Sequence, residues 1–174
     1  MDKQEFINRY NISDTAVTTP DLQVLSVPSL CETLEEFLTG NFGGAVTVEC
    51  EAMPNEFVLL SIEYLAIFLR RLFCDIHGRT LLQINFQSFK GHISITVSAD
   101  SPIHLGNTEI SQLIKLGQNA GMNTCYEDCK ITLTAEYTDA DLRSIYARMP
   151  DGAKAFILSR LFWVFFNNQP DTIQ

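Results

Sequence analysis

Hydrophobic and polar residues alternate strictly in two neighbouring stretches near the middle of the chain. In residues 82–87 and again in residues 93–98, every second side chain is apolar and its neighbours are Ser, Thr, Asn or Gln. A period of two is typical of β-strands that bury one face and expose the other. Because only a short segment with Lys90 and Gly91 separates the stretches, they predict an antiparallel hairpin.

Three other segments carry apolar residues at intervals of three and four. These are residues 29–38, 58–76 and 108–122, and the spacing is typical of helices that lie on a sheet. Ser29 and Glu32 give the first helix a capping box, and Gly43 and Gly44 turn the chain after it. Residues 53–57 are interpreted as a loop. Short apolar runs predict further strands at residues 21–25, 45–50, 123–126 and 130–137, so the chain is expected to be an α+β protein.

The C-terminal part has a different pattern. A helix starting at residue 138 is broken at Pro150 and Gly152, and residues 153–166 are almost wholly apolar. The segment is shorter than the roughly 20 residues that cross a bilayer, so no membrane span is expected. A helix that is apolar on nearly every side has to be buried on every side. We therefore expect it to pack in the core, with an edge that contacts a protein partner or a second copy. The residues expected to carry this interaction are Phe156, Leu161, Trp163 and Phe166.

Composition narrows the class of protein. The 174 residues carry a net charge of −9 with only 12 Lys and Arg, which disfavours a nucleic-acid partner. The N-terminus has no apolar signal core, so a cytoplasmic location is expected. The five cysteines are odd in number and lack a framework spacing, and are interpreted as reduced thiols.

The order of the predicted elements over residues 21–137 resembles the ATP-binding domain of sensor histidine kinases, in the GHKL ATPase superfamily. The order is helix, strand, long helix, hairpin, helix and hairpin. The resemblance implies a two-layer α/β sandwich, with a mixed, mostly antiparallel sheet and helices on one face. It leaves residues 1–20 as an N-terminal tail. Residues 138–174 become a C-terminal helical extension, packed on the domain or at a dimer interface.

In that family the long helix carries two Asn four residues apart, and the second binds Mg²⁺. Arg71 and Asp75 stand at these places here. The Asp75 carboxylate is a chemically suitable Mg²⁺ ligand, and Arg71 a suitable partner for a triphosphate. The alternative interpretation is a solvated helix end, where Arg71 pairs with Asp75 one turn later.

The family's adenine-binding Asp follows the last strand Val by two residues. In this sequence Val97 plus two is Ala99, which has no carboxylate. Asp100 comes one residue later and belongs on the opposite face, because strand side chains alternate. It substitutes only if a bulge shifts the register. Ser101 and Ile103 replace the two glycines that would admit the nucleotide.

The lid and the phosphate-binding turn of the family are reduced as well. Only six residues separate Ile103 from Ile110, and Gly106 is the one remnant of the glycine-rich turn. A helix N-terminus attracts phosphate, but Glu109 in the first turn would repel it.

These departures favour a degenerate, non-catalytic histidine-kinase-like domain that regulates or binds other proteins in bacterial signal transduction. ATP and Mg²⁺ are then not expected as cofactors. The alternative is a working ATP/Mg-binding kinase or anti-sigma-factor-like protein with altered motifs. An unrelated α+β binding domain remains a third interpretation.

Overall fold

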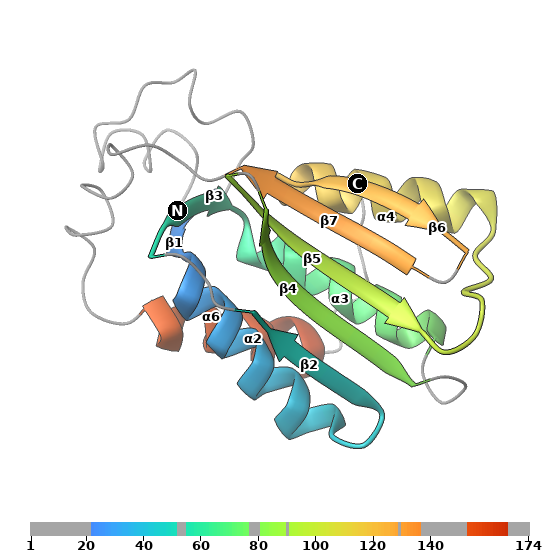
Figure 1. The fold of residues 1–174 in the computed structure, drawn as a ribbon, viewed down its shortest axis with the longest axis horizontal. Helices are drawn as coiled ribbons and strands as arrows, with labels where there is room; N and C mark the ends of the chain where they lie inside the picture. Colours follow the sequence, from blue (N-terminus) through green and yellow to red (C-terminus); the bar gives the residue numbers. More distant parts are fainter. Residues whose placement is uncertain are drawn as a thin grey trace.

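The computed structural model describes residues 22–51, 55–76, 81–89, 91–128, 130–136 and 153–166. A five-stranded sheet forms one layer, and helices lie behind it (Figure 1). The sheet is mixed and mostly antiparallel, so the predicted α+β class and its two-layer arrangement are confirmed.

The large sheet has the order β2-β4-β5-β7-β6. Its strands are β2 (Val46–Cys50), β4 (Leu82–Phe89), β5 (His92–Ala99), β6 (Asn123–Glu127) and β7 (Lys130–Glu136). Only β2 and β4 are parallel, and the other neighbours are antiparallel. Both predicted hairpins are present. Gly91 turns the first of them with a φ of 81°, a conformation that glycine adopts without strain.

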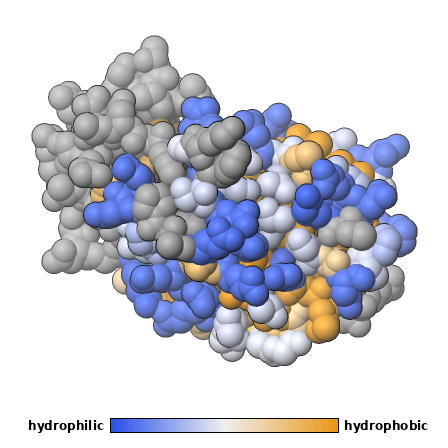
Figure 2. All heavy atoms as spheres, viewed as in Figure 1, coloured by the Kyte–Doolittle hydropathy of each residue, from blue (hydrophilic) through white to orange (hydrophobic). Residues whose placement is uncertain are grey.

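The two faces of this sheet differ in polarity, as the alternation predicts. Ile84, Ile95 and Leu133 are fully buried on the helix side. The facing side of β4, β5 and β7 carries Gln, Asn, Ser and Thr, and hydrophilic and intermediate side chains spread across it in Figure 2. One face therefore holds the core, and the other is open and mostly uncharged.

Three helices contribute much of the remaining core: α2 (Val27–Phe42), α3 (Ile62–Ile76) and α4 (Asn107–Asn119). Helix α2 begins two residues before the predicted start. Its N-cap is Ser26, whose Oγ accepts a hydrogen bond from the Ser29 amide at 3.4 Å, and Pro28 occupies the first turn. Helix α2 lies along β2, and α4 packs against both α3 and β6.

The prediction of one helix over residues 58–76 is wrong at its start. Residues Phe57–Leu60 form a strand, β3, which pairs with β1 (Gln23–Ser26) in a separate two-stranded sheet. The helix starts only after Ser61, whose Oγ accepts a hydrogen bond from the Tyr64 amide at 3.4 Å. Gln23 Oε1 accepts a hydrogen bond from the Ile62 amide at 3.1 Å. Pairing with a distant strand thus determines the structure of this apolar run.

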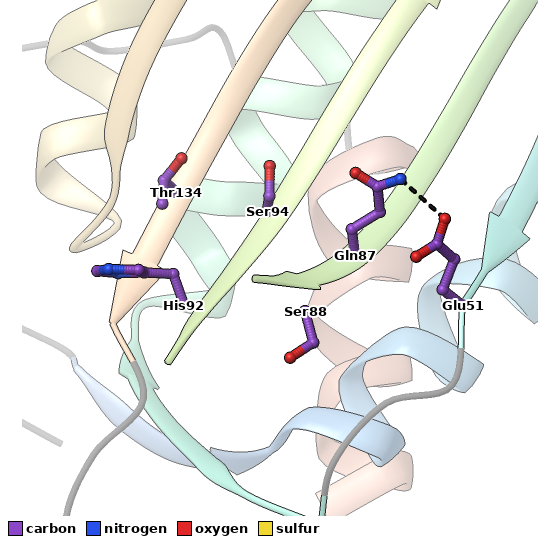
Figure 3. Close-up of a pocket in the computed structure, with 6 residues that line it drawn as sticks. All are labelled: Glu51, Gln87, Ser88, His92, Ser94 and Thr134. Atoms are coloured by element: carbon purple, nitrogen blue, oxygen red, sulfur yellow. Dashed lines mark hydrogen bonds between the residues drawn. The ribbon is translucent and has the colours of Figure 1, made fainter. Parts of the chain in front are cut away.

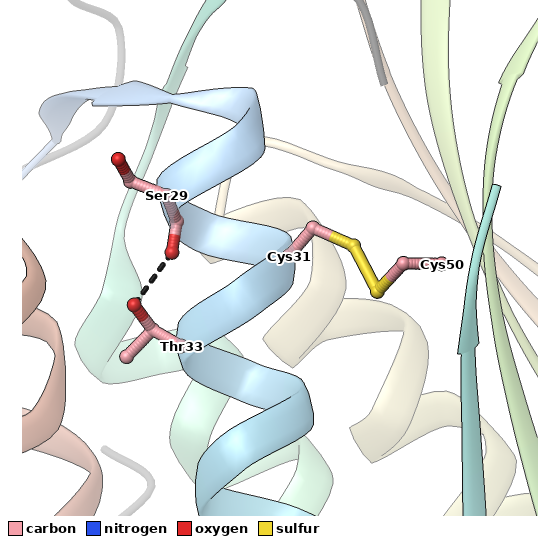
Figure 4. The surroundings of a disulfide bond; sticks show 4 residues. All are labelled: Ser29, Cys31, Thr33 and Cys50. Atoms are coloured by element: carbon pink, nitrogen blue, oxygen red, sulfur yellow. Dashed lines mark hydrogen bonds between the residues drawn. A yellow bond between two sulfur atoms is a disulfide. The ribbon is translucent and has the colours of Figure 1, made fainter. Parts of the chain in front are cut away.

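The expectation that all the cysteines are reduced thiols is also wrong. Cys31 of α2 and Cys50 of β2 form a disulfide, with their Cα atoms 6.5 Å apart (Figure 4). The cause is packing. Cys31 faces β2 from the buried side of the helix, at a separation typical of disulfides. Cys125 is a free, exposed thiol.

The C-terminal helix α6 spans Ala153–Phe166, the range that the sequence predicts. It packs against α2 and α3. The Phe37 ring of α2 meets Phe165 edge to face at a centroid distance of 5.2 Å, and Lys154 Nζ lies 2.5 Å from Glu36 Oε2. This hydrogen bond and the charge of Glu36 raise the pKa of Lys154.

The expectation that α6 packs in the core is met on one side of the helix, and its other side is exposed. Leu161 is fully buried within the chain, so it belongs to the core rather than to a contact surface. Phe156 is half-buried, whereas Trp163 and Phe166 are more than half exposed. The difference arises because α6 lies on other helices and presents only one side to them.

The predicted N-terminal tail and the helix starting at residue 138 lie outside the described residues. Among the residues that are described, no helix is long and apolar enough to cross a membrane.

Candidate functional site

The first candidate site lies where β5 ends. The β4–β5 ladder runs in unbroken register from the Phe89–His92 pair to the Leu82–Ala99 pair. Just beyond it, the Asp100 amide donates to the carbonyl of Leu81 at 3.4 Å. The ladder therefore contains no bulge that would turn Asp100 to the helix side.

The positions of the two candidate adenine ligands follow from this register. Ala99 shares the helix side with Val97 and packs against the hydrophobic core. Asp100 is exposed. The position that the family resemblance assigns to an adenine-binding carboxylate thus holds a methyl group.

The loop after β5 is fixed by a single residue. Ile103 is buried, its amide donates to the Asp128 carbonyl at 2.6 Å, and its carbonyl accepts the Tyr126 hydroxyl. Leu105 packs on the same core. Both backbone polar groups of Ile103 are therefore satisfied by the β6–β7 hairpin, which holds the loop against the sheet.

The turn of that hairpin carries an ion pair. Lys130 Nζ lies 2.8 Å from Glu127 Oε2, and this hydrogen bond together with the negative charge of Glu127 raises the pKa of Lys130. Both side chains are exposed, so the pair is screened by solvent and contributes little to stability.

The N-terminus of α4 is occupied by the chain itself. Gly106 is the N-cap, and its amide donates to Glu109 Oε2 at 2.6 Å. A carboxylate at this position interacts favourably with the helix dipole and satisfies a free amide. A phosphate would seek the same amides and the same positive potential. Glu109 thus takes up one of these amides and adds a negative charge that repels anions.

This geometry gives the first testable prediction. Replacing Glu109 by Ala is expected to lower the free energy of unfolding by about 1 kcal/mol, the ordinary value of a capping interaction. The expected decrease in Tm is about 2–4 °C for a chain of this size. Glu35→Ala is the matched control, because Glu35 is an exposed helical glutamate away from an N-terminus. Equal decreases for the two variants would contradict the capping role.

Arg71 and Asp75 lie on α3, at the end of the fold where β5 terminates. Only four residues follow α3 before Leu81, which bonds to Asp100 (Figure 1). Arg71 is half-buried. The Asp75 side chain lies outside the described part of the structure, so its expected role as a Mg²⁺ ligand stays a prediction.

Among the described residues, two features disfavour the nucleotide site that the family resemblance implies. The adenine position lacks an acceptor, and Glu109 brings negative charge to the helix end that would receive phosphate. Within the described ranges, no three His, Cys, Asp or Glu side chains converge as metal ligands do. No catalytic step is therefore assigned to this end of the fold.

The second candidate site is a shallow pocket of about 360 Å³ on the open face of the sheet (Figure 3). Gln87 and Ser94 are direct cross-strand partners, as are Ser94 and Thr134, and Gln87 Nε2 donates to Glu51 Oε1 at 2.8 Å. His92 is the first residue of β5, and its Nδ1 is buried without a hydrogen-bond partner among the described atoms. The lining residues are Glu51, Gln87, Ser88, His92, Ser94 and Thr134.

This pocket lies on the face opposite to Ala99, so it is separate from the nucleotide position of the family. Its polar side chains can donate and accept hydrogen bonds, but they include no nucleophile held by a base. Sequence analysis missed it. The polar alternation of β4 and β5 was visible, but the contributions of Glu51 and Thr134 depend on which strands become their neighbours.

No protein-family model and no curated protein sequence matches the chain. Among solved structures, it is similar to the histidine kinase AdeS of Acinetobacter baumannii, with a TM-score of 0.46 and 8% identity over 78% of this chain and 74% of that one. It is also similar to the ATP-binding domain of PrrB from Mycobacterium tuberculosis, with a TM-score of 0.49 and 12% identity over 68% and 99% of the two chains. A third match is the cytoplasmic segment of the histidine kinase QseC, with a TM-score of 0.43 and 8% identity over 78% and 84%.

Two of the three matches are named as histidine kinases, and the third is named as an ATP-binding domain. Because each TM-score is below 0.5, no residue role is carried from these proteins to this chain.

Proposed function

We propose that the chain is a histidine-kinase-like module of bacterial signal transduction that has lost nucleotide binding and acts through protein contacts. The observation that supports this most directly is Glu109. A side chain of the domain itself accepts the hydrogen bond of the Gly106 amide at the N-terminus of α4 and places negative charge there. The methyl side chain of Ala99 and the anchored Ile103 support the same proposal from the adenine side.

The alternative, a working ATP/Mg-binding kinase or anti-sigma-factor-like protein, makes an opposite thermodynamic prediction. A ligand that binds only the folded state at 100 times its Kd stabilises that state by about 2.7 kcal/mol. For a chain of this size this corresponds to a Tm increase of roughly 5–11 °C. Such a shift is easily measured by scanning calorimetry.

The test is a titration of the full chain with ATP and equimolar Mg²⁺ up to 10 mM. We expect the Tm to stay within 1 °C of a magnesium sulfate control at matched ionic strength. A saturable increase in Tm with ATP concentration would contradict the proposal. Asp100→Ala then identifies the site, because loss of the increase in this variant would assign the adenine to Asp100.

A further inference from the structure

Helix α6 has two apolar faces, and the described elements of the fold pack against only one of them. Ile157, Leu161 and Val164 are buried against α2 and α3. On the other side, Phe162, Trp163 and Phe166 are 58%, 53% and 51% exposed. Exposed aromatic side chains on one helix face usually mark a contact surface.

The exposed face is a continuous helical stripe. Its members are Ala155, Ser159, Phe162, Trp163 and Phe166, all of them exposed. Steps of four, three and four residues from position 155 to position 166 keep their side chains on one side of a helix. We call these five residues the α6 stripe.

The α6 stripe carries no charge. The two charged residues of α6 are engaged within the chain, because Lys154 pairs with Glu36 and the Arg160 guanidinium lies 5.4 Å from the centre of the Phe156 ring. The chain as a whole has a net charge of −9. Two copies that meet through this stripe therefore avoid placing like charges against each other.

Side-chain size along the α6 stripe is graded. The N-terminal half has the small residues Ala155 and Ser159, and the C-terminal half has the aromatic rings. Consider two copies of α6 that pack antiparallel, with the two-fold axis passing between positions 160 and 161. Position 155 of one copy then faces position 166 of the other copy, and position 159 faces position 162. Each small residue then faces a phenylalanine, which is the complementarity that a two-fold interface requires.

We infer that the α6 stripe is a homodimer interface in which two copies of α6 pack antiparallel. The inference rests on the protein-contact role proposed above, and it names the partner as a second copy of this chain. It can fail independently, because the ATP titration does not involve α6.

The area of the stripe sets the strength of the dimer. Three aromatic side chains, each about half exposed, offer roughly 300 Å² per copy. A stable interface buries about 800 Å² per partner. The dimer is therefore weak and forms with a Kd of about 10–100 μM. Because apolar contact drives it and the copies carry like net charge, added salt strengthens it.

The experiment is sedimentation equilibrium of the full chain from 10 to 500 μM, in 0.15 M and 0.5 M NaCl. Trp163 is the one tryptophan of the sequence and lies in the stripe, so its fluorescence reports the same event. We expect dimerisation with a blue shift of the emission, and at least a tenfold increase in Kd for Trp163→Glu measured by sedimentation. Leu81→Glu is the control, because Leu81 is 60% exposed at the far end of β4. It should leave the Kd unchanged.

The orientation has its own test. Ser159→Lys and Phe162→Glu should each weaken self-association, and an equimolar mixture should restore it, because antiparallel packing brings Lys and Glu opposite each other. Circular dichroism and Tm confirm that each variant is folded. The inference is overturned if the chain is a monomer at every concentration, or if Trp163→Glu leaves the Kd of the dimer unchanged. It is also overturned if the mixture of Ser159→Lys and Phe162→Glu stays monomeric.

Discussion

Reduction of the Cys31–Cys50 disulfide is expected to lower the free energy of unfolding by about 3 kcal/mol. The value follows from the loop that the bond closes, because the two cysteines are 19 residues apart and the bond restricts the unfolded chain. For a chain of this size the corresponding decrease in Tm is roughly 6–12 °C. The bond also joins α2 to the edge strand β2, so its loss frees the edge of the sheet.

The measurement compares thermal unfolding with and without a phosphine reductant. Cys50→Ser is the control, because a chain that lacks the bond should already have the lower Tm and should not respond to the reductant. Thiol titration of the unreduced, denatured protein should show at least two fewer reactive groups than after reduction. An unchanged Tm together with an unchanged thiol number would show that the two cysteines are not bonded in solution.

The disulfide illustrates one limit of prediction from sequence. The cysteine spacing matches no framework, and the pairing follows only once α2 lies along β2. A fixed distance between two side chains is a property of the tertiary structure. An argument from the number of cysteines to a reducing compartment therefore could not predict this disulfide.

The start of α3 shows a second limit. Residues 57–60 are a short apolar run that continues directly into a helical pattern, and periodicity does not distinguish a buried strand from a helix over so few residues. The strand forms because residues 23–26 pair with it. The long periodic segments behave differently. The β4–β5 hairpin and α6 were predictable, because each carries its own pattern and a clear boundary.

The candidate site at the end of β5 was predictable only in part. Counting from Val97 places Ala99 on the helix side, because strand parity is a local property. The bond from Tyr126 to Ile103 and the burial of Ile103 required the fold, since 23 residues separate the two partners. For α6 the sequence predicts the helix and its bounds. It does not predict which side is covered, because that depends on α2 and α3.

Replacing Gly117 by Ala is expected to lower the free energy of unfolding by about 1–2 kcal/mol. Gly117 is buried where α4 packs on β6, close to the Leu133 side chain of β7. A Cβ atom there would overlap Thr124 Oγ1 and come within 3.2 Å of Leu133 Cδ2. Overpacking of this kind costs about 1–3 kcal/mol, which exceeds the roughly 1 kcal/mol that Ala gains over Gly within a helix.

Two variants separate the steric effect from helix propensity. Gly40 lies in α2 with open space around its Cα, so Gly40→Ala should stabilise the protein by about 0.5–1 kcal/mol. Thr124→Ala removes the nearest obstacle, since only Thr124 Cβ, at 3.4 Å, then remains of that side chain near the new methyl group. The double variant should therefore recover most of the loss, with a coupling of at least 1 kcal/mol in a chemical-denaturation cycle.

The sign of that coupling decides what fixes the position of α4. The Thr124 hydroxyl is buried without a hydrogen-bond partner among the described atoms, so its removal costs little polar energy. Recovery in the double variant would show that contact with β6 sets the distance of α4 from the sheet. Since Glu109 caps the N-terminus of the same helix, α4 would then be held at one end by its own cap and at the other by close packing. If the decreases in the free energy of unfolding for the two single variants simply add in the double variant, Leu133 and β7 set that distance. Thr124 then has no part in positioning α4.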